Sequence, residues 1–115
     1  MNNKLVLNRI EHNLLSMQMD DSEPLFILYA DTKRDIEGVT LNDVIQSLMR
    51  LVDLGFSECI VHEDGKWNLY KNITTTKLHK RFKGQSEEER IKYPMHTDEY
   101  YFRITPKGRI EEEKE

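Results

Sequence analysis

Between Thr40 and Phe56 the chain reads Thr-Leu-Asn-Asp-Val-Ile-Gln-Ser-Leu-Met-Arg-Leu-Val-Asp-Leu-Gly-Phe. Thr40 is a favourable N-cap, because its hydroxyl accepts a hydrogen bond from a free backbone N–H of the first helical turn. Asp43, three residues on, completes an acidic variant of the capping box. Gly55 suits the left-handed position that commonly ends a helix. The stretch predicts one helix over residues 40–54, followed by an extended chain that begins at Phe56.

Apolar residues recur along this helix at intervals of three and four, which places them on one side. They are Leu41, Val44, Ile45, Leu48, Leu51 and Val52, with Met49 at the edge of the stripe. The other side carries Asn42, Asp43, Gln46, Ser47, Arg50 and Asp53. Asn, Gln and Arg read base edges in the major groove of DNA, whereas two aspartates against one arginine leave this side slightly acidic. The pattern predicts a helix that is packed on its leucine side and bare on the other.

Length and composition limit the class of protein. The chain has 115 residues, enough for one domain with a hydrophobic core, and a formal net charge of −4, which is typical of a soluble cytoplasmic protein. No apolar run approaches the length of a membrane span, and the start of the chain does not read as a signal peptide. Cys59 is the only cysteine, which excludes an internal disulfide and a Cys-based zinc site. We expect Cys59 to be a buried strand residue.

Charge is unevenly distributed along the chain. Residues 1–65 are strongly acidic, whereas residues 66–83 contain six basic side chains and no acidic one. The six are Lys66, Lys71, Lys77, Lys80, Arg81 and Lys83. A local basic patch is what attraction to phosphate requires, whatever the net charge of the whole protein. The segment predicts either a phosphate-binding surface or lysines that merely keep an exposed hairpin soluble.

Further helices are predicted before and after the central one. Residues 3–19 read as an amphipathic helix, and a short second helix, capped by Ser22 with Pro24 in its first turn, extends to about Thr32. A polar connector over residues 31–39 follows, longer than the turn of a standard helix-turn-helix. Near the other end of the chain, Thr105 and Pro106 begin a last short helix.

A hairpin is predicted directly after the central helix. Residues 57–63 read as a strand, Asp64-Gly65 as a tight turn, and residues 67–73 as the returning strand. The residues expected on one face of that second strand are Trp67, Leu69 and Ile73. Residues 100–104 alternate as a further strand.

Two segments fall outside this pattern. Residues 74–96 read as an insertion, with a short basic stretch over residues 77–83 and a brief helix capped by Ser86 and Glu89. Residues 111–115 read as a frayed, solvated tail.

Two pieces of this pattern resemble the winged-helix superfamily, in the style of small bacterial regulators. One is Leu48-x-x-Leu51-x-x-x-Gly55-Phe56, where a recognition-type helix ends and the chain enters the wing. The other is Tyr101-Phe102-Arg103-Ile104-Thr105-Pro106-Lys107-Gly108-Arg109, like a last wing strand with Thr-Pro-Lys-Gly at a helix start. The resemblance implies a single α+β domain over residues 1–115. Its three-helix core would pack against a small antiparallel sheet, the wing, enlarged by the insertion over residues 74–96.

The resemblance further implies a DNA-binding transcriptional regulator whose central helix, residues 40–54, enters the major groove. Asn42, Gln46 and Arg50 would face base edges. The residues expected to meet phosphates are Lys66, Lys71, Lys77, Lys80, Arg81, Lys83 and Arg103. A homodimer through the first and last helices is also implied. The alternative is a protein-interaction module that docks through the acidic N-terminal half or through the insertion.

Signals of catalysis and of cofactor binding are weak. His12, His62, His79 and His96 are scattered, without a pair at metal-ligand spacing. Neither a glycine-rich phosphate loop nor a grouping of nucleophile and base is present in the sequence. Most aromatic residues are expected to pack the sheet against the helices rather than to stack on bases. We expect a protein that is not an enzyme and that holds no metal or cofactor.

Overall fold

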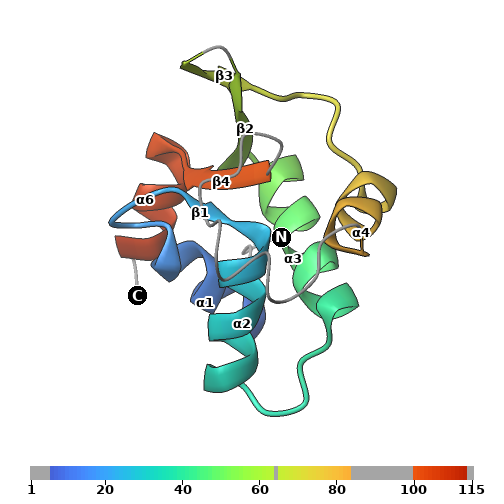
Figure 1. Cartoon of the computed structure of the whole chain (residues 1–115). Coiled ribbons are helices and arrows are strands. Elements are labelled where there is room, and N and C mark those ends of the chain that lie inside the picture. Colours follow the sequence, from blue (N-terminus) through green and yellow to red (C-terminus); the bar gives the residue numbers. More distant parts are fainter. Residues whose placement is uncertain (1–5, 64, 84–99, 114–115) are drawn as a thin grey trace.

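Five helices and a four-stranded antiparallel sheet make up the part of the chain that the computed structural model describes, namely residues 6–63, 65–83 and 100–113 (Figure 1). Residues 81–83 are described by their backbone alone. The helices are α1 (Arg9–Met17), α2 (Leu25–Asp35), α3 (Leu41–Asp53), α4 (Thr75–Lys83) and α6 (Pro106–Glu113). The strands are β1 (Glu23–Pro24), β2 (Ser57–Glu63), β3 (Lys66–Leu69) and β4 (Tyr100–Ile104). The predicted α+β class is confirmed.

The sheet joins strands that are far apart in the sequence. Its order is β1-β4-β2-β3, and each neighbouring pair is antiparallel. β2 and β4 have the predicted bounds, with Cys59 opposite Phe102 and Glu58 opposite Arg103. Because successive side chains of a strand point to opposite faces, Cys59 and Phe102 are buried on the inner face, toward the helices. Glu58 and Arg103 lie on the outer face.

Helix α3 lies at the centre of the helical layer, in contact with α1, α2, α4 and β2. Its leucine side is buried, as predicted. The Thr40 hydroxyl accepts from the Asp43 backbone N–H at 3.1 Å, and the Asp43 carboxylate accepts from the Thr40 N–H at 3.0 Å. Gly55 has a φ of +79°. The predicted cap and the predicted glycine end of this helix are both confirmed.

The end of α3 is held by the start of α6. The Thr105 hydroxyl donates to the Gly55 carbonyl at 2.6 Å and accepts from the Gly108 N–H at 3.0 Å. Lys107 Nζ donates to the Leu54 carbonyl at 3.0 Å. A Cβ on Gly108 would lie 2.1 Å from the Phe56 carbonyl oxygen, so only glycine permits this approach. These contacts, the α3–α6 clamp, join the two sequence pieces around Gly55 and Gly108.

The first helix is shorter than predicted. The Asn8 side chain accepts from the Glu11 N–H at 2.8 Å, and the Glu11 carboxylate accepts from the Asn8 N–H at 2.8 Å. This capping box starts α1 at Arg9 rather than near residue 3. Residues 3–5 of the predicted helix lie outside the described residues.

The start of the second helix was wrongly predicted. Ser22 is not its cap, because Glu23 and Pro24 are extended and pair with Phe102 and Tyr101 of β4. The far end also differs: α2 continues to Asp35. The connector before α3 is therefore residues 36–40, shorter than predicted.

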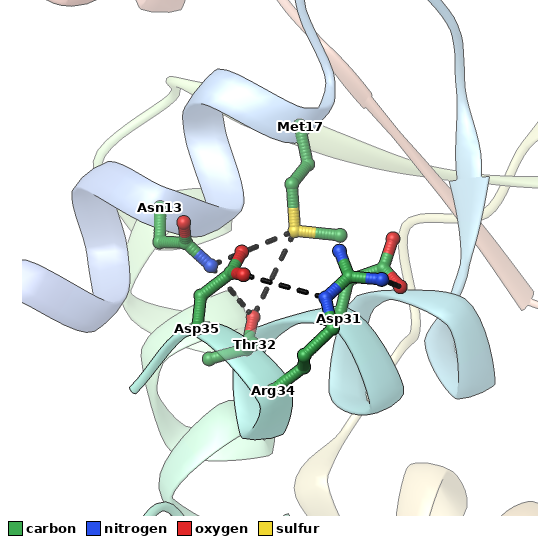
Figure 2. Close-up of polar contacts among 6 residues, drawn as sticks. All are labelled: Asn13, Met17, Asp31, Thr32, Arg34 and Asp35. Carbon is green, nitrogen blue, oxygen red and sulfur yellow. Dashed lines mark hydrogen bonds and ion pairs between the residues drawn. The ribbon is translucent and has the colours of Figure 1, made fainter. Parts of the chain in front are cut away.

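Polar contacts hold the last turns of α2 in place (Figure 2). Asn13 Nδ2 of α1 donates to the buried Thr32 hydroxyl at 3.1 Å. Arg34 lies 3.6 Å from an Asp31 oxygen and 3.5 Å from an Asp35 oxygen on the surface of α2. The bond to Asn13 satisfies a hydroxyl whose burial would otherwise be unfavourable.

The returning strand of the hairpin is also shorter than predicted. β3 ends at Leu69, and a turn at Lys71 and Asn72 redirects the chain. Ile73 is buried, whereas Trp67 and Leu69 are 43% and 45% exposed. Trp67 and Leu69 share a face of β3 as predicted, but the expectation that Ile73 lies on that face was wrong, because the strand ends before it.

The basic stretch within the insertion is helical. Residues 77–83 belong to α4, which packs against α3 and α2 through the buried Leu78. It is part of the helical layer rather than of the hairpin (Figure 1). The predicted helix at Ser86 and Glu89 lies outside the described residues.

Residues 111–113, predicted as part of a frayed tail, instead continue α6. Glu112 lies on the α1 side, with its Oε2 3.7 Å from His12 Nδ1. α1 and α6 therefore contact each other within one chain, which occupies part of the surface expected for a dimer. Residues 114 and 115 lie outside the described residues.

Candidate nucleic-acid interface

The solvent-facing side of α3 is a narrow strip between α1 and α4. We call it the α3 strip; its exposed residues are Asn42, Gln46, Arg50 and Asp53. Asn42 Oδ1 lies 3.2 Å from His79 Nε2 of α4, at one border. Arg50 contacts Glu11 of α1, at the other border. Ser47, predicted on the bare side, is buried.

Arg50 is bound to a buried carboxylate. Its Nη1 donates to Glu11 Oε1 at 2.5 Å and to Oε2 at 2.6 Å. Glu11 is fully buried, while the Arg50 side chain is 44% exposed. A carboxylate taken out of water is costly without a partner, so this ion pair constrains the guanidinium. Both bonds come from Nη1, so the Nε–H and the two Nη2–H groups remain as donors for a ligand.

The basic helix α4 lies beside the α3 strip. Lys80 is exposed and follows His79, which contacts Asn42. Lys77 is held differently: its Nζ donates to the Tyr70 hydroxyl at 2.8 Å and to the Asn72 carbonyl at 3.0 Å. The backbones of Arg81 and Lys83 continue α4. The structure thus places His79 at the border of the α3 strip, with the exposed Lys80 next to it in the sequence, and holds Lys77 against the turn after β3.

The remaining predicted cations lie elsewhere. Lys66 and Lys71 are exposed at the start of β3 and in the turn after it. Arg103 lies on the outer face of the sheet, where its Nε donates to Glu58 Oε1 at 2.5 Å. Since α3 packs on the inner face, the sheet separates Arg103 from the α3 strip.

The outer face also carries an aromatic cluster that the sequence reasoning missed. The Trp67 ring lies edge-on to Tyr101, with 4.9 Å between centroids, and the same distance from His62. A cavity of about 290 Å³ lies beside it. Its lining includes Gln18, Ser22, Ile60, Trp67, Arg103 and Arg109. The alternation of Trp67 and Leu69 in the sequence indicated that they share a face of the strand. It did not indicate that this face is the outer one, on the side opposite to α3.

Other kinds of site find little support. Within residues 6–63, 65–83 and 100–113, no three His, Cys, Asp or Glu side chains gather as metal ligands would. Burial raises the pKa of the Cys59 thiol to about 12, in line with the expected buried strand residue. In the same part of the chain, every helix is too short or too polar to cross a membrane.

Comparison of the chain with family models, with curated proteins and with solved structures finds no significant match.

Proposed function

We propose that the chain is a winged-helix DNA-binding domain that acts as a transcriptional regulator. The element order supports this: α1, β1, α2 and α3 precede β2, and β4 then returns to pair with both β2 and β1. That order matches three helices followed by a wing. β3 and α4 are then an insertion between the two wing strands, and the five-residue connector before α3 is closer to a helix-turn-helix than the sequence predicted.

The observation that carries the proposal is the contact between Asn42 and His79. It fixes a basic helix beside the exposed side of α3, so that base-reading and phosphate-binding groups lie next to each other. Asn42 and Gln46 suit base edges, and Lys80 suits a phosphate beside them. Lys66 and Lys71 would extend the phosphate contacts along the hairpin.

Two features reduce the expected affinity. Asp43 and Asp53 lie on or beside the α3 strip, and the charge of Arg50 is largely balanced by Glu11. Arg50 would then reach DNA only through its remaining donors. We expect weak binding with a shallow dependence on salt, because few phosphates are neutralised.

The proposal is tested by binding of a fluorescent random-sequence duplex across a salt series. We expect log K to fall linearly with log salt, with a slope of about −0.9 for each phosphate neutralised. Lys80→Gln should flatten that slope by about 0.9. Arg103→Gln is the matched control, because it removes the same charge from the outer face and should leave the slope unchanged. Equal effects of the two variants would contradict the proposed surface.

One observation favours a second candidate, a protein-interaction module. Because Glu11 balances the charge of Arg50, aspartates dominate the charge of the α3 strip. A negative strip attracts a basic protein surface and repels DNA. This candidate requires that the duplex is not retained even at low salt. It also requires that an Asp53→Lys variant loses a protein that the unmodified chain captures.

A further inference from the structure

We propose that Glu11 is a positioning residue, which holds Arg50 so that its guanidinium reads a guanine in the major groove. The inference rests on the proposed function, because it names the base that the α3 strip would select. Arg50 Nη1 donates to both carboxylate oxygens of Glu11, which is fully buried. The same carboxylate accepts from the Asn8 N–H at the start of α1, so its own position is fixed. The ion pair therefore orients an arginine that would otherwise move freely on the surface.

The ion pair leaves one edge of the guanidinium free. In this planar group Nη1 occupies one corner, and the opposite edge carries an Nε–H and an Nη2–H side by side. Among the described residues, neither Nε nor Nη2 of Arg50 has a hydrogen-bond partner, and the side chain is 44% exposed. Arg50 thus keeps a complete two-donor edge that is directed away from Glu11.

Two adjacent donors match the major-groove edge of guanine. The O6 and N7 atoms of this base are both acceptors, and a bidentate arginine is the commonest specific contact to them. Adenine presents an amino donor beside its N7, so it cannot accept from both donors of the edge. The free edge of Arg50 therefore selects guanine among the bases.

Charge favours a base over a phosphate as the ligand of Arg50. The carboxylate of Glu11 balances the guanidinium, and the exposed Asp53 follows three residues later on the same strip. A phosphate at Arg50 would add a negative charge beside two carboxylates. Guanine is neutral, so the acidic strip opposes its acceptors much less. Arg50 would then contribute sequence preference rather than general affinity for DNA.

Base analogues test this contact. A pool of random-sequence duplexes is bound at low salt and the retained fraction is sequenced; we expect guanine to be enriched at one position. Replacing that guanine by 7-deazaguanine removes the N7 acceptor and should weaken binding about tenfold, as expected for a bidentate contact. Inosine is the matched control. It keeps O6 and N7 and lacks only the minor-groove amino group, so it should bind like guanine.

Two variants assign the contact to Arg50 and its orientation to Glu11. Arg50→Lys keeps a cation beside Glu11 but has no planar two-donor edge, so the preference for guanine over 7-deazaguanine should fall below about twofold. Glu11→Gln should lower the preference in the same way. Because it also frees the charge of Arg50 for a phosphate, it should steepen the salt slope by about 0.9. The matched control is Glu58→Gln, which removes the carboxylate of the Arg103 pair on the outer face and should change neither quantity.

The outcomes separate this inference from the proposed function. If the duplex pool is not retained at any salt concentration, both fail. If the pool is retained without enrichment of guanine, or if 7-deazaguanine binds as tightly as guanine, this inference fails and the proposed function stands. An Arg50→Lys variant that keeps the preference also overturns it. A Glu11→Gln variant that weakens binding to every duplex equally, with no steeper salt slope, overturns the positioning role of Glu11.

Discussion

The guanidinium of Arg50 stabilises the fold through an ion pair with Glu11, so only part of it is available to a ligand. It lies where a base-reading side chain was expected, yet it is the cation that the described structure provides for the fully buried Glu11. Glu11 in turn caps α1 through the Asn8 N–H. A single carboxylate thus joins the start of α1 to the exposed side of α3. Loss of Arg50 would leave that carboxylate buried and unpaired.

Arg50→Ala is therefore expected to lower the free energy of unfolding by about 2 kcal/mol. This is less than the 3–5 kcal/mol of a wholly buried pair, because the arginine is partly solvated. Urea unfolding measures the change. Glu11→Gln with Arg50→Ala should cost less than the sum of the two single variants, since the neutral amide needs no cation. Strict additivity would show that the pair is not coupled.

Glu23 provides a pH-dependent contribution to stability. Burial raises the pKa of its carboxyl above the ordinary value of 4.5, and Asp21 and Asp31 raise it further. In the interval between the two pKa values the folded chain holds a proton that the unfolded chain has lost, so stability falls as pH rises through it. Glu23→Gln should raise Tm at neutral pH and lose this advantage below pH 4.5. A gain in Tm that is the same at all pH values would refute this account of Glu23.

At the scale of elements, the α3–α6 clamp fixes the orientation of α3. Thr105 and Lys107 donate to the carbonyls of Gly55 and Leu54, directly after α3, and the Thr105 N–H donates to the Phe56 carbonyl at 3.0 Å. Gly108 allows α6 to approach this backbone. The clamp explains why Leu-Gly-Phe and Thr-Pro-Lys-Gly both occur in one chain: the first ends α3, and the second binds that end.

Gly108→Ala tests the clamp. Alanine normally stabilises a helix interior relative to glycine by about 1 kcal/mol. Here a Cβ would meet the Phe56 carbonyl, so we expect the free energy of unfolding to fall by about 3 kcal/mol. Gly38→Ala is the control: its φ of +82° costs about 1 kcal/mol, with open space around the Cβ. A stabilising Gly108→Ala would show that α6 does not approach Phe56 in this way.

Elements set by neighbouring residues were predictable from the sequence, and those set by distant partners were not. The cap at Thr40, the end at Gly55, and the bounds of β2 and β4 rest on local signals. β1 has two residues and exists only because β4 pairs with it. α4 was missed because Leu78, its buried apolar residue among the side chains that the structure describes, indicates a packed helix only once α3 is seen beside it.

At the scale of the whole molecule, the sheet separates two surfaces. The helical side presents the α3 strip with Lys80, and the outer face presents Trp67, Leu69 and the pair of Arg103 with Glu58. The sequence indicated candidate DNA contacts but could not divide them between these sides. That division depends on strand alternation and on where α4 packs.

The most direct test of the DNA-binding proposal is an NMR titration of the protein with a random-sequence duplex at low salt. We expect the signals of the side-chain amides of Asn42 and Gln46 and of the backbone amide of Lys80 to shift. The backbone amide signals of Glu58 and Arg103 should not change. Shifts confined to the outer face, or none at any DNA concentration, would contradict the assignment of the α3 strip as the interface.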